Sequence, residues 1–263
     1  MFNLIDTHAH LDMPQFDHDR EEVIERAYRS GVTSIINVGT DIRSSEYAVQ
    51  LARASPCIFA AVGFHPGQVA SITESDIRQL AGLTRGSKVV AIGEIGLDYY
   101  RGYSSREVQN RVLEWQLEIA SDAGLPVIVH CRRAEKDILA TLTKWKSRNN
   151  ALCGVIHCFS GSIEVARSYL DIGFYISLGA YIGYPTSRSN HETVRAIPLE
   201  RLLLETDSPF LPPQSHRGRR NEPSYITATL AALAGIKGMP PDIIAQSTTA
   251  NARRLFRLDQ VCI

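Results

Sequence analysis

The chain alternates between short apolar runs and longer amphipathic segments. Eight runs are apolar at successive positions, a pattern typical of parallel strands that are covered on both faces. Polar or glycine-rich residues follow each run, which indicates that the strand ends there. We expect the strands at residues 3–8, 33–38, 57–63, 88–93, 126–130, 153–157, 174–178 and 201–206.

Amphipathic helices are expected between these strands. The start of the clearest one is marked by Ser104 and Glu107, which predict a capping box. Thr73 is a candidate N-cap of a second helix, and Ser160 or Ser162 of a third. Apolar residues at helical spacing predict helices at residues 17–30, 44–54, 74–84, 105–123, 135–147, 162–172 and 189–196, and two more at about 224–236 and 241–256 after the last strand.

Regular alternation of strand and helix predicts an α/β fold, specifically a TIM (β/α)8 barrel. An open dinucleotide-binding sheet is disfavoured because no G-x-G-x-x-G motif opens the first helix. Candidate functional residues also follow six different strands, whereas an open sheet would gather them at one switch point. Without a visible linker or repeat, we treat residues 1–263 as a single domain.

Histidines and carboxylates are concentrated where the predicted strands end. The carboxyl ends of barrel strands open at one face, so we expect these side chains to converge there into a metal site. Five of the eight histidines have this placement. They are His8, His10, His65, His130 and His157, and the carboxylates are Glu94, Glu205 and Asp207.

The first strand carries the motif D-T-H-A-H. Because side chains alternate along an extended strand, Asp6, His8 and His10 lie on the same side. An H-x-H motif alone is weak, but its position at a strand end favours ligation of one cation by both imidazoles. Asp6 is then expected to orient a ring without touching the metal.

Glu94 follows the apolar run V-V-A-I, where an unpaired charge would be costly to bury. It could pair with a neighbouring arginine, but we favour a carboxylate that bridges two cations. His130 and His157 each close an aliphatic strand and are assigned to the second cation. Asp98 is expected further out, where it caps or shapes a loop.

The last predicted strand ends in Glu205 and Asp207. Asp207 is expected to ligate metal and to help take the proton of the attacking water, so that Asp207 and Glu94 are the candidate catalytic residues. Glu205 could support a metal ligand from behind or belong to an additional site. A third ion is therefore left open.

Candidate substrate contacts come from His65, Arg132, Arg217 and Arg219. His65 could bind substrate or a further metal, or be an ordinary loop histidine. Arginines after two strands could hold a phosphodiester, although such charges are often only solvated. Lys plus Arg equal Asp plus Glu at 28 each, so the net charge is zero and any nucleic-acid contact must come from a local patch.

Cysteine use and the chain's N-terminal residues predict a cytoplasmic protein. The five cysteines, Cys57, Cys131, Cys153, Cys158 and Cys262, include no C-x-x-C pair, which argues against a disulfide framework or a zinc knuckle. Neither a signal-peptide pattern nor an apolar stretch of about 18 residues is present. We expect no membrane association and no obligate protein partner.

The ordered series of motifs resembles the TatD-related family of metal-dependent deoxyribonucleases over essentially the whole chain. The motifs are D-T-H-A-H-L-D, G-F-H-P, G-E-I-G-L-D-Y-Y, P-V-I-V-H-C-R, H-C-F-S-G, L-L-L-E-T-D-S-P-F-L-P-P and H-R-G-R-R-N-E-P. This resemblance implies a distorted TIM barrel and Mg-dependent hydrolysis of DNA. It places metal ligands at His8, His10, Glu94, His130, His157 and Asp207, and a histidine on the substrate side at His65.

The function predicted is phosphodiester cleavage by a metal-activated water, with DNA or another phosphodiester as substrate. Two divalent ions about 3.5 to 4 Å apart are expected, and mixed imidazole and carboxylate ligation leaves Mg, Mn or Zn open. The alternative is an amide or ester hydrolase, or an aminoacyl-tRNA deacylase, on the same ions. A non-catalytic nucleic-acid-binding protein is disfavoured because binding alone needs no such cluster of titratable groups.

Overall fold

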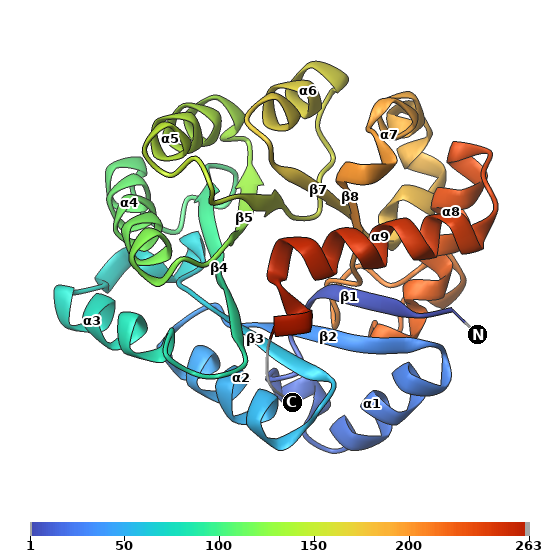
Figure 1. Ribbon diagram of the computed structural model, residues 1–263, viewed down its shortest axis with the longest axis horizontal. Helices are drawn as coiled ribbons and strands as arrows, with labels where there is room; N and C mark the ends of the chain where they lie inside the picture. The colour runs from blue at the N-terminus through green and yellow to red at the C-terminus, as the bar shows by residue number, and fades with distance from the viewer. Residues whose placement is uncertain (1, 261–263) are drawn as a thin grey trace.

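Eight parallel strands follow one another around a single sheet in residues 2–260, the part of the chain that the computed structural model describes (Figure 1). Every predicted strand is present, and each pairs with the next one in sequence. The strands are β1 (Leu4–Ala9), β2 (Val32–Val38), β3 (Ile58–Val62), β4 (Val89–Asp98), β5 (Val127–Arg132), β6 (Gly154–Ile156), β7 (Tyr175–Leu178) and β8 (Leu202–Leu204).

The sheet closes where the segment after β8 meets β1. Asp207 N–H donates to the carbonyl of His8 at 2.9 Å, and His10 N–H donates to the carbonyl of Ser208 at 2.8 Å. Ala9 and Ser208 form a parallel bridge between the same segments. The predicted (β/α)8 barrel is confirmed, and its closure places two candidate ligands of β1 beside Asp207.

Helices surround the barrel and connect its strands (Figure 1). Thr73 and Ser162 are N-caps as predicted, but α4 is capped by Ser105, whose hydroxyl accepts from Val108 N–H. The predicted capping box of Ser104 and Glu107 is wrong: the N-cap lies one residue later, and the Ser104 hydroxyl donates to the Pro66 carbonyl instead. The helices are α1 (Arg20–Arg29), α2 (Ile42–Ala54), α3 (Glu74–Leu83), α4 (Arg106–Ala123), α5 (Glu135–Arg148), α6 (Ile163–Asp171), α7 (His191–Ala196), α8 (Ile226–Lys237) and α9 (Pro241–Phe256).

Strand β4 continues to Asp98, beyond its predicted end at residue 93. Gly96 makes this extension possible. Its φ is +141°, and a Cβ at this position would lie 1.9 Å from the His130 carbonyl oxygen. Only glycine therefore lets β4 remain paired with β5 here, and the pairing carries Asp98 into the same region as His130.

The apolar interior of the barrel is closed at one end by α9, which crosses the opening in Figure 1. Asn251 donates to the carbonyl of Leu202, and Thr249 donates to the carbonyl of Asn3, so α9 covers the amino ends of β8 and β1. The helix thereby leaves the carboxyl ends of the strands free. Leu255, Phe256 and Leu258 pack against Ile5, Phe59, Val90, Ile128, Val155 and Leu203 inside the barrel.

None of the helices in residues 2–260 is both long enough and apolar enough to cross a bilayer.

Replacing Phe256 with alanine should destabilise the fold. Its ring is 2% exposed and fills the closed end of the barrel, so truncation should lower the free energy of unfolding by about 3 to 5 kcal/mol. Urea unfolding followed by circular dichroism measures this. The control is Tyr28→Ala, which removes a ring that is 66% exposed and should change stability little. Equal stability of the two variants would contradict the assigned role of α9.

Candidate metal centre

Buried histidines and carboxylates from six parts of the barrel meet at the carboxyl ends of the strands. The side chains of His8 and Glu94 are 0% and 5% exposed, although both are polar. Three groups of potential ligands have their ligand atoms within 4.8 Å of one another. They are His8, His10 and Asp207; His65, Glu94 and His130; and His8, His157 and Glu205.

Glu94 lies between two sets of imidazoles. Its Oε2 is 3.4 Å from His8 Nε2 and 3.8 Å from His10 Nε2. Its Oε1 is 2.9 Å from His130 Nδ1 and 3.0 Å from His157 Nε2. Each carboxylate oxygen thus faces a different pair of nitrogens, which is the arrangement that a carboxylate shared by two cations requires.

The alternative that Glu94 pairs with an arginine is wrong. Among the described residues its ion-pair partners are histidines, and His65 Nε2 is the fifth of them, at 3.7 Å from Oε1. His65 therefore lies at the centre and not on a remote loop. The predicted convergence of strand ends is present in the structure.

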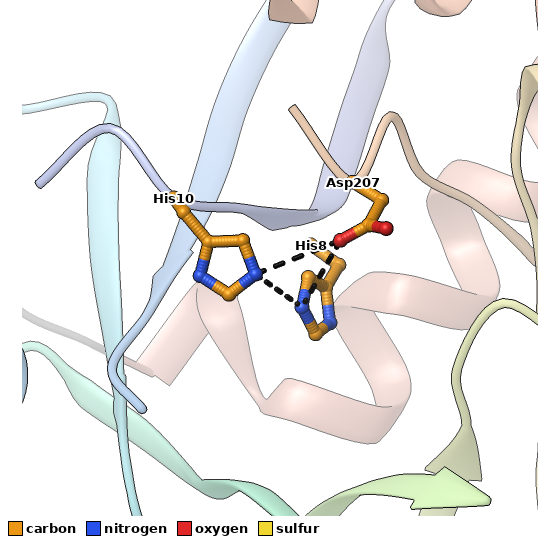
Figure 2. Close-up of side chains that lie close together, drawn as sticks. All are labelled: His8, His10 and Asp207. Carbon is orange, nitrogen blue, oxygen red and sulfur yellow. Dashed lines mark hydrogen bonds and ion pairs between the residues drawn. The ribbon is translucent and has the colours of Figure 1, made fainter. Parts of the chain in front are cut away.

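His8 on β1 and His10 just after it point at Asp207 (Figure 2). His8 Nε2 and His10 Nε2 are 3.1 Å apart, and Asp207 Oδ1 lies 3.8 and 3.6 Å from them. His10 is held in this orientation because its Nδ1 donates to the Val38 carbonyl at 2.7 Å. Two ring nitrogens directed at the same space beside a carboxylate match the donor set of a divalent cation.

The charges of the cluster perturb its pKa values. Burial would raise the pKa of Glu94, but the surrounding imidazoles, His157 first among them, hold it well below its usual value. Burial would lower the pKa of His10, yet the hydrogen bond to Asp207 and the charges of Glu94 and Asp207 raise it to about 9. Burial lowers the pKa of His65 to about 4. The carboxylates of Glu94 and Asp207 are therefore stable in the ionised form only beside positive charge, which protons or bound cations can provide.

Glu205 lies behind His157 and is fully buried. Its Oε1 accepts from Cys158 N–H at 2.6 Å, and the Ser177 hydroxyl donates to Oε2. His157 Nδ1 is 3.6 Å from Glu205 Oε1, an ion-pair distance. The position matches both expectations for Glu205, a support for His157 and a member of a further ligand group.

Asp6 does not orient a ring as expected. Its carboxylate accepts from Thr206 N–H at 3.0 Å, from the Thr206 hydroxyl at 2.6 Å and from His8 N–H at 3.3 Å. The side chain faces the segment after β8, because that segment closes the barrel against β1. Asp6 thus fixes the backbone on both sides of the closure.

Asp98 caps the loop after β4, as expected, and it also reaches the centre, which we did not expect. Its Oδ2 lies 3.3 Å from His130 Nε2, while its Oδ1 accepts from the N–H groups of Tyr100 and Arg101, each at 2.9 Å. Asp98 is four residues after Glu94, and the even spacing puts both on one side of an extended strand. That signal was available in the sequence once the strand was extended past Gly96.

Two glutamines of α4 hold the backbone beside the centre and were not predicted. Gln116 accepts from Phe64 N–H at 2.7 Å and donates to its carbonyl at 3.2 Å, next to His65. Gln109 accepts from Asp98 N–H at 2.8 Å and donates to its carbonyl at 3.1 Å. Polar residues on a helix carry no sequence signal for such a contact.

The predicted basic residues divide into two groups. Arg132, Arg217 and Arg219 are exposed, and the Arg132 guanidinium lies 4.2 Å from the centre of the Tyr100 ring. Arg220 instead pairs with Asp19 at 2.7 Å and joins the segment after β8 to the region before α1. Of the cysteines, Cys57, Cys131, Cys153 and Cys158 are free thiols, and Cys262 lies outside the described residues.

Replacing Glu94 with glutamine should weaken metal binding. At a Mn²⁺ concentration of about 100 times the dissociation constant, the native protein should gain about 2.7 kcal/mol of unfolding free energy. The variant should lose most of this gain because the shared carboxylate is neutralised. Urea unfolding with and without Mn²⁺ measures the difference. Glu114→Gln is the matched control, since that side chain is 56% exposed on α4. Undiminished stabilisation of the Glu94 variant by metal would refute the site.

Comparisons with known proteins all identify the same family. The family model described as TatD related DNase matches residues 5–257. An uncharacterized metal-dependent hydrolase YabD from Bacillus subtilis is 42% identical, over 97% of this chain and 100% of the relative. A 3'-5' ssDNA/RNA exonuclease TatD from Salmonella typhimurium is 34% identical, over 97% of this chain and 99% of that protein.

The crystal structure of YjjV, a TatD homologue from Escherichia coli K12, has the same fold. It superposes with a TM-score of 0.90 at 33% identity, and the match covers 97% of this chain and 98% of the other. Family model, sequence relatives and structure agree over nearly the full length. The chain therefore belongs to the TatD-related DNase family of metal-dependent hydrolases.

Proposed function

We propose that this protein hydrolyses phosphodiester bonds in nucleic acid, as a deoxyribonuclease that acts on single strands. The observation that carries the proposal is Glu94, whose two oxygens each face a separate pair of histidines. The Salmonella relative, named a 3'-5' ssDNA/RNA exonuclease, supports the same substrate class.

The residues divide into ligands for two divalent ions. His8, His10 and Asp207 would hold one ion, and His130 and His157 the other, with Glu94 shared between them. Such ions, whether Mg, Mn or Zn, would lower the pKa of a water molecule and neutralise charge on the phosphoryl oxygens. The group of His8, His157 and Glu205 keeps a third ion open.

The protein's own groups then have distinct tasks. Asp207 accepts a proton from the attacking water, since its carboxylate borders His8 and His10 and is ionised. Burial would raise the pKa of Asp207, but the hydrogen bond to His10 holds it below its usual value. His65, which faces Glu94 and stays neutral, contacts the scissile phosphate. Glu205 keeps His157 in place.

Exposed arginines favour a phosphodiester over an acyl substrate. Arg132 ends β5, and Arg217 and Arg219 follow β8, so all three belong to the segments that form the mouth of the barrel. Amide, ester or aminoacyl-tRNA cleavage would use the same ligands without needing these charges. The four free cysteines agree with a reducing compartment, and we propose the cytoplasm.

Replacing Asp207 with asparagine should abolish most cleavage of a single-stranded DNA oligonucleotide. Loss of the proton acceptor and of a metal ligand should lower kcat by about 10² to 10⁴-fold. Release of nucleotides in the presence of Mn²⁺ or Mg²⁺ measures this, and circular dichroism verifies the fold. Glu114→Gln should keep native activity. Full activity of the Asp207 variant, or hydrolysis of acyl substrates alone by the native protein, would refute the proposed function.

Replacing Arg132 with alanine should weaken binding of the oligonucleotide. One lost phosphate contact should raise KM and reduce the slope of log(kcat/KM) against log salt by about 0.7. The control is Arg78→Ala, which removes a 71% exposed arginine from α3. An unchanged salt dependence in the Arg132 variant would show that this residue is only solvated.

A further inference from the structure

We propose that Phe210 is the stacking surface for the terminal base of a single strand bound at the metal centre. This inference rests on the proposed function and adds a binding position for the base. It concerns an exposed aromatic side chain that neither the core nor the ligand groups use.

Phe210 stands directly beside the candidate ligands. Its ring centre lies 6.0 Å from that of His10 with the rings at 69°, and its N–H donates to the Asp207 carbonyl at 2.8 Å. The side chain is nevertheless 44% exposed. An apolar ring is therefore presented to solvent at the edge of the space where a scissile phosphate would lie.

Hydrogen bonds hold the backbone around Phe210 in place, so the exposure of the ring is not a result of a mobile loop. Asn221, which is fully buried, donates through Nδ2 to the Phe210 carbonyl at 2.6 Å and to the Thr206 carbonyl at 2.8 Å. Its own N–H donates to the Pro209 carbonyl at 3.1 Å. A buried amide thus fixes the segment that carries the ring.

Two residues near Phe210, one on each side in the chain, adopt unfavourable backbone conformations. Asp207 has φ +57° and Leu211 has φ +48°, a region that costs side chains other than glycine about 1 to 3 kcal/mol. Such conformations persist where the surroundings impose them, and they are concentrated at functional sites. A single exposed aromatic residue is common on protein surfaces, but Phe210 lies between two residues with costly backbone conformations and next to a candidate metal centre.

The aromatic face of a nucleobase makes it a suitable partner for the Phe210 ring. Every base has an aromatic face, and stacking on a protein side chain contributes similarly for all four. Bases inside a duplex are already stacked on both sides, so only a single strand or a frayed end can offer one. Phe210 would thereby favour single strands without reading sequence.

A basic group lies on the same loop. The Arg217 guanidinium is 6.0 Å from the centre of the Tyr184 ring, and the Tyr184 hydroxyl donates to the Pro212 carbonyl at 2.6 Å. Leu211 separates Phe210 from Pro212. A phosphate of the bound strand would meet positive charge here while its base meets the ring.

The test compares two single-stranded DNA oligonucleotides that differ only at the 3' terminal residue, which is thymidine in one and an abasic tetrahydrofuran residue in the other. Native protein should remove thymidine with about tenfold higher kcat/KM. Phe210→Ala should lose that preference, chiefly through KM for the thymidine substrate, and should cleave the abasic substrate like native protein. Phe210→Trp should restore the preference. Tyr28→Ala, which removes an aromatic ring from α1, should behave as native.

Each other result has a definite meaning. If Phe210→Ala slows both substrates equally, or leaves the preference intact, the stacking proposal is wrong while phosphodiester hydrolysis stands. Mn²⁺ binding measured by equilibrium dialysis separates damage to the metal centre from loss of stacking, because the proposal requires unchanged binding. If native protein cleaves neither oligonucleotide under Mn²⁺ or Mg²⁺, the proposed function fails and the stacking role fails with it.

Discussion

A buried negative charge governs the organisation of this molecule. Glu94 is 4% exposed, and a carboxylate in that position is tolerated only if positive charge surrounds it. Histidines from β1, from β5 and from the segments after β1, β3 and β6 lie within 4 Å of its two oxygens. Closure of the sheet between β1 and β8 adds the second carboxylate, Asp207. Two carboxylates buried together are unfavourable by themselves. The same negative charge favours the binding of divalent cations.

Much of this arrangement could be predicted because residues at the carboxyl ends of parallel strands lie together at one end of the barrel. His8, His10, Glu94, His130, His157 and Asp207 each follow an apolar run, and all six meet at the end of the barrel where strand termini open. The alternation of side chains along a strand relates His8 to His10, and it relates Glu94 to Asp98 in the same way. The contact of Asp98 with His130 escaped prediction because the strand was expected to end at residue 93, whereas Gly96 permits it to continue to Asp98.

Contacts that depend on tertiary geometry could not be predicted from patterns. Asp6 shares a side with His8 and His10 in the strand pattern, but Thr206 of the closing segment donates two hydrogen bonds to its carboxylate. Arg220 lies in the same basic stretch as Arg217 and Arg219, yet its partner Asp19 is two hundred positions away in the chain. Ser104 fits the pattern of a helix cap, and the neighbouring turn recruits its hydroxyl instead. In each case the chain distance between partners hides the contact from sequence analysis.

Helix α4 has a consequence for how the loops of this barrel can change. Gln109 and Gln116 lie two turns apart, and each bonds to both backbone groups of one residue, Asp98 and Phe64 respectively. A single helix therefore aligns the loop after β3 with the end of β4. Insertions in either loop would have to preserve the same helical register, so these two loops are bound to vary together. The loops after β5 and β8 escape that restraint. Substrate contacts beside Arg132 can therefore change, in evolution or by design, without a matching change beside His65.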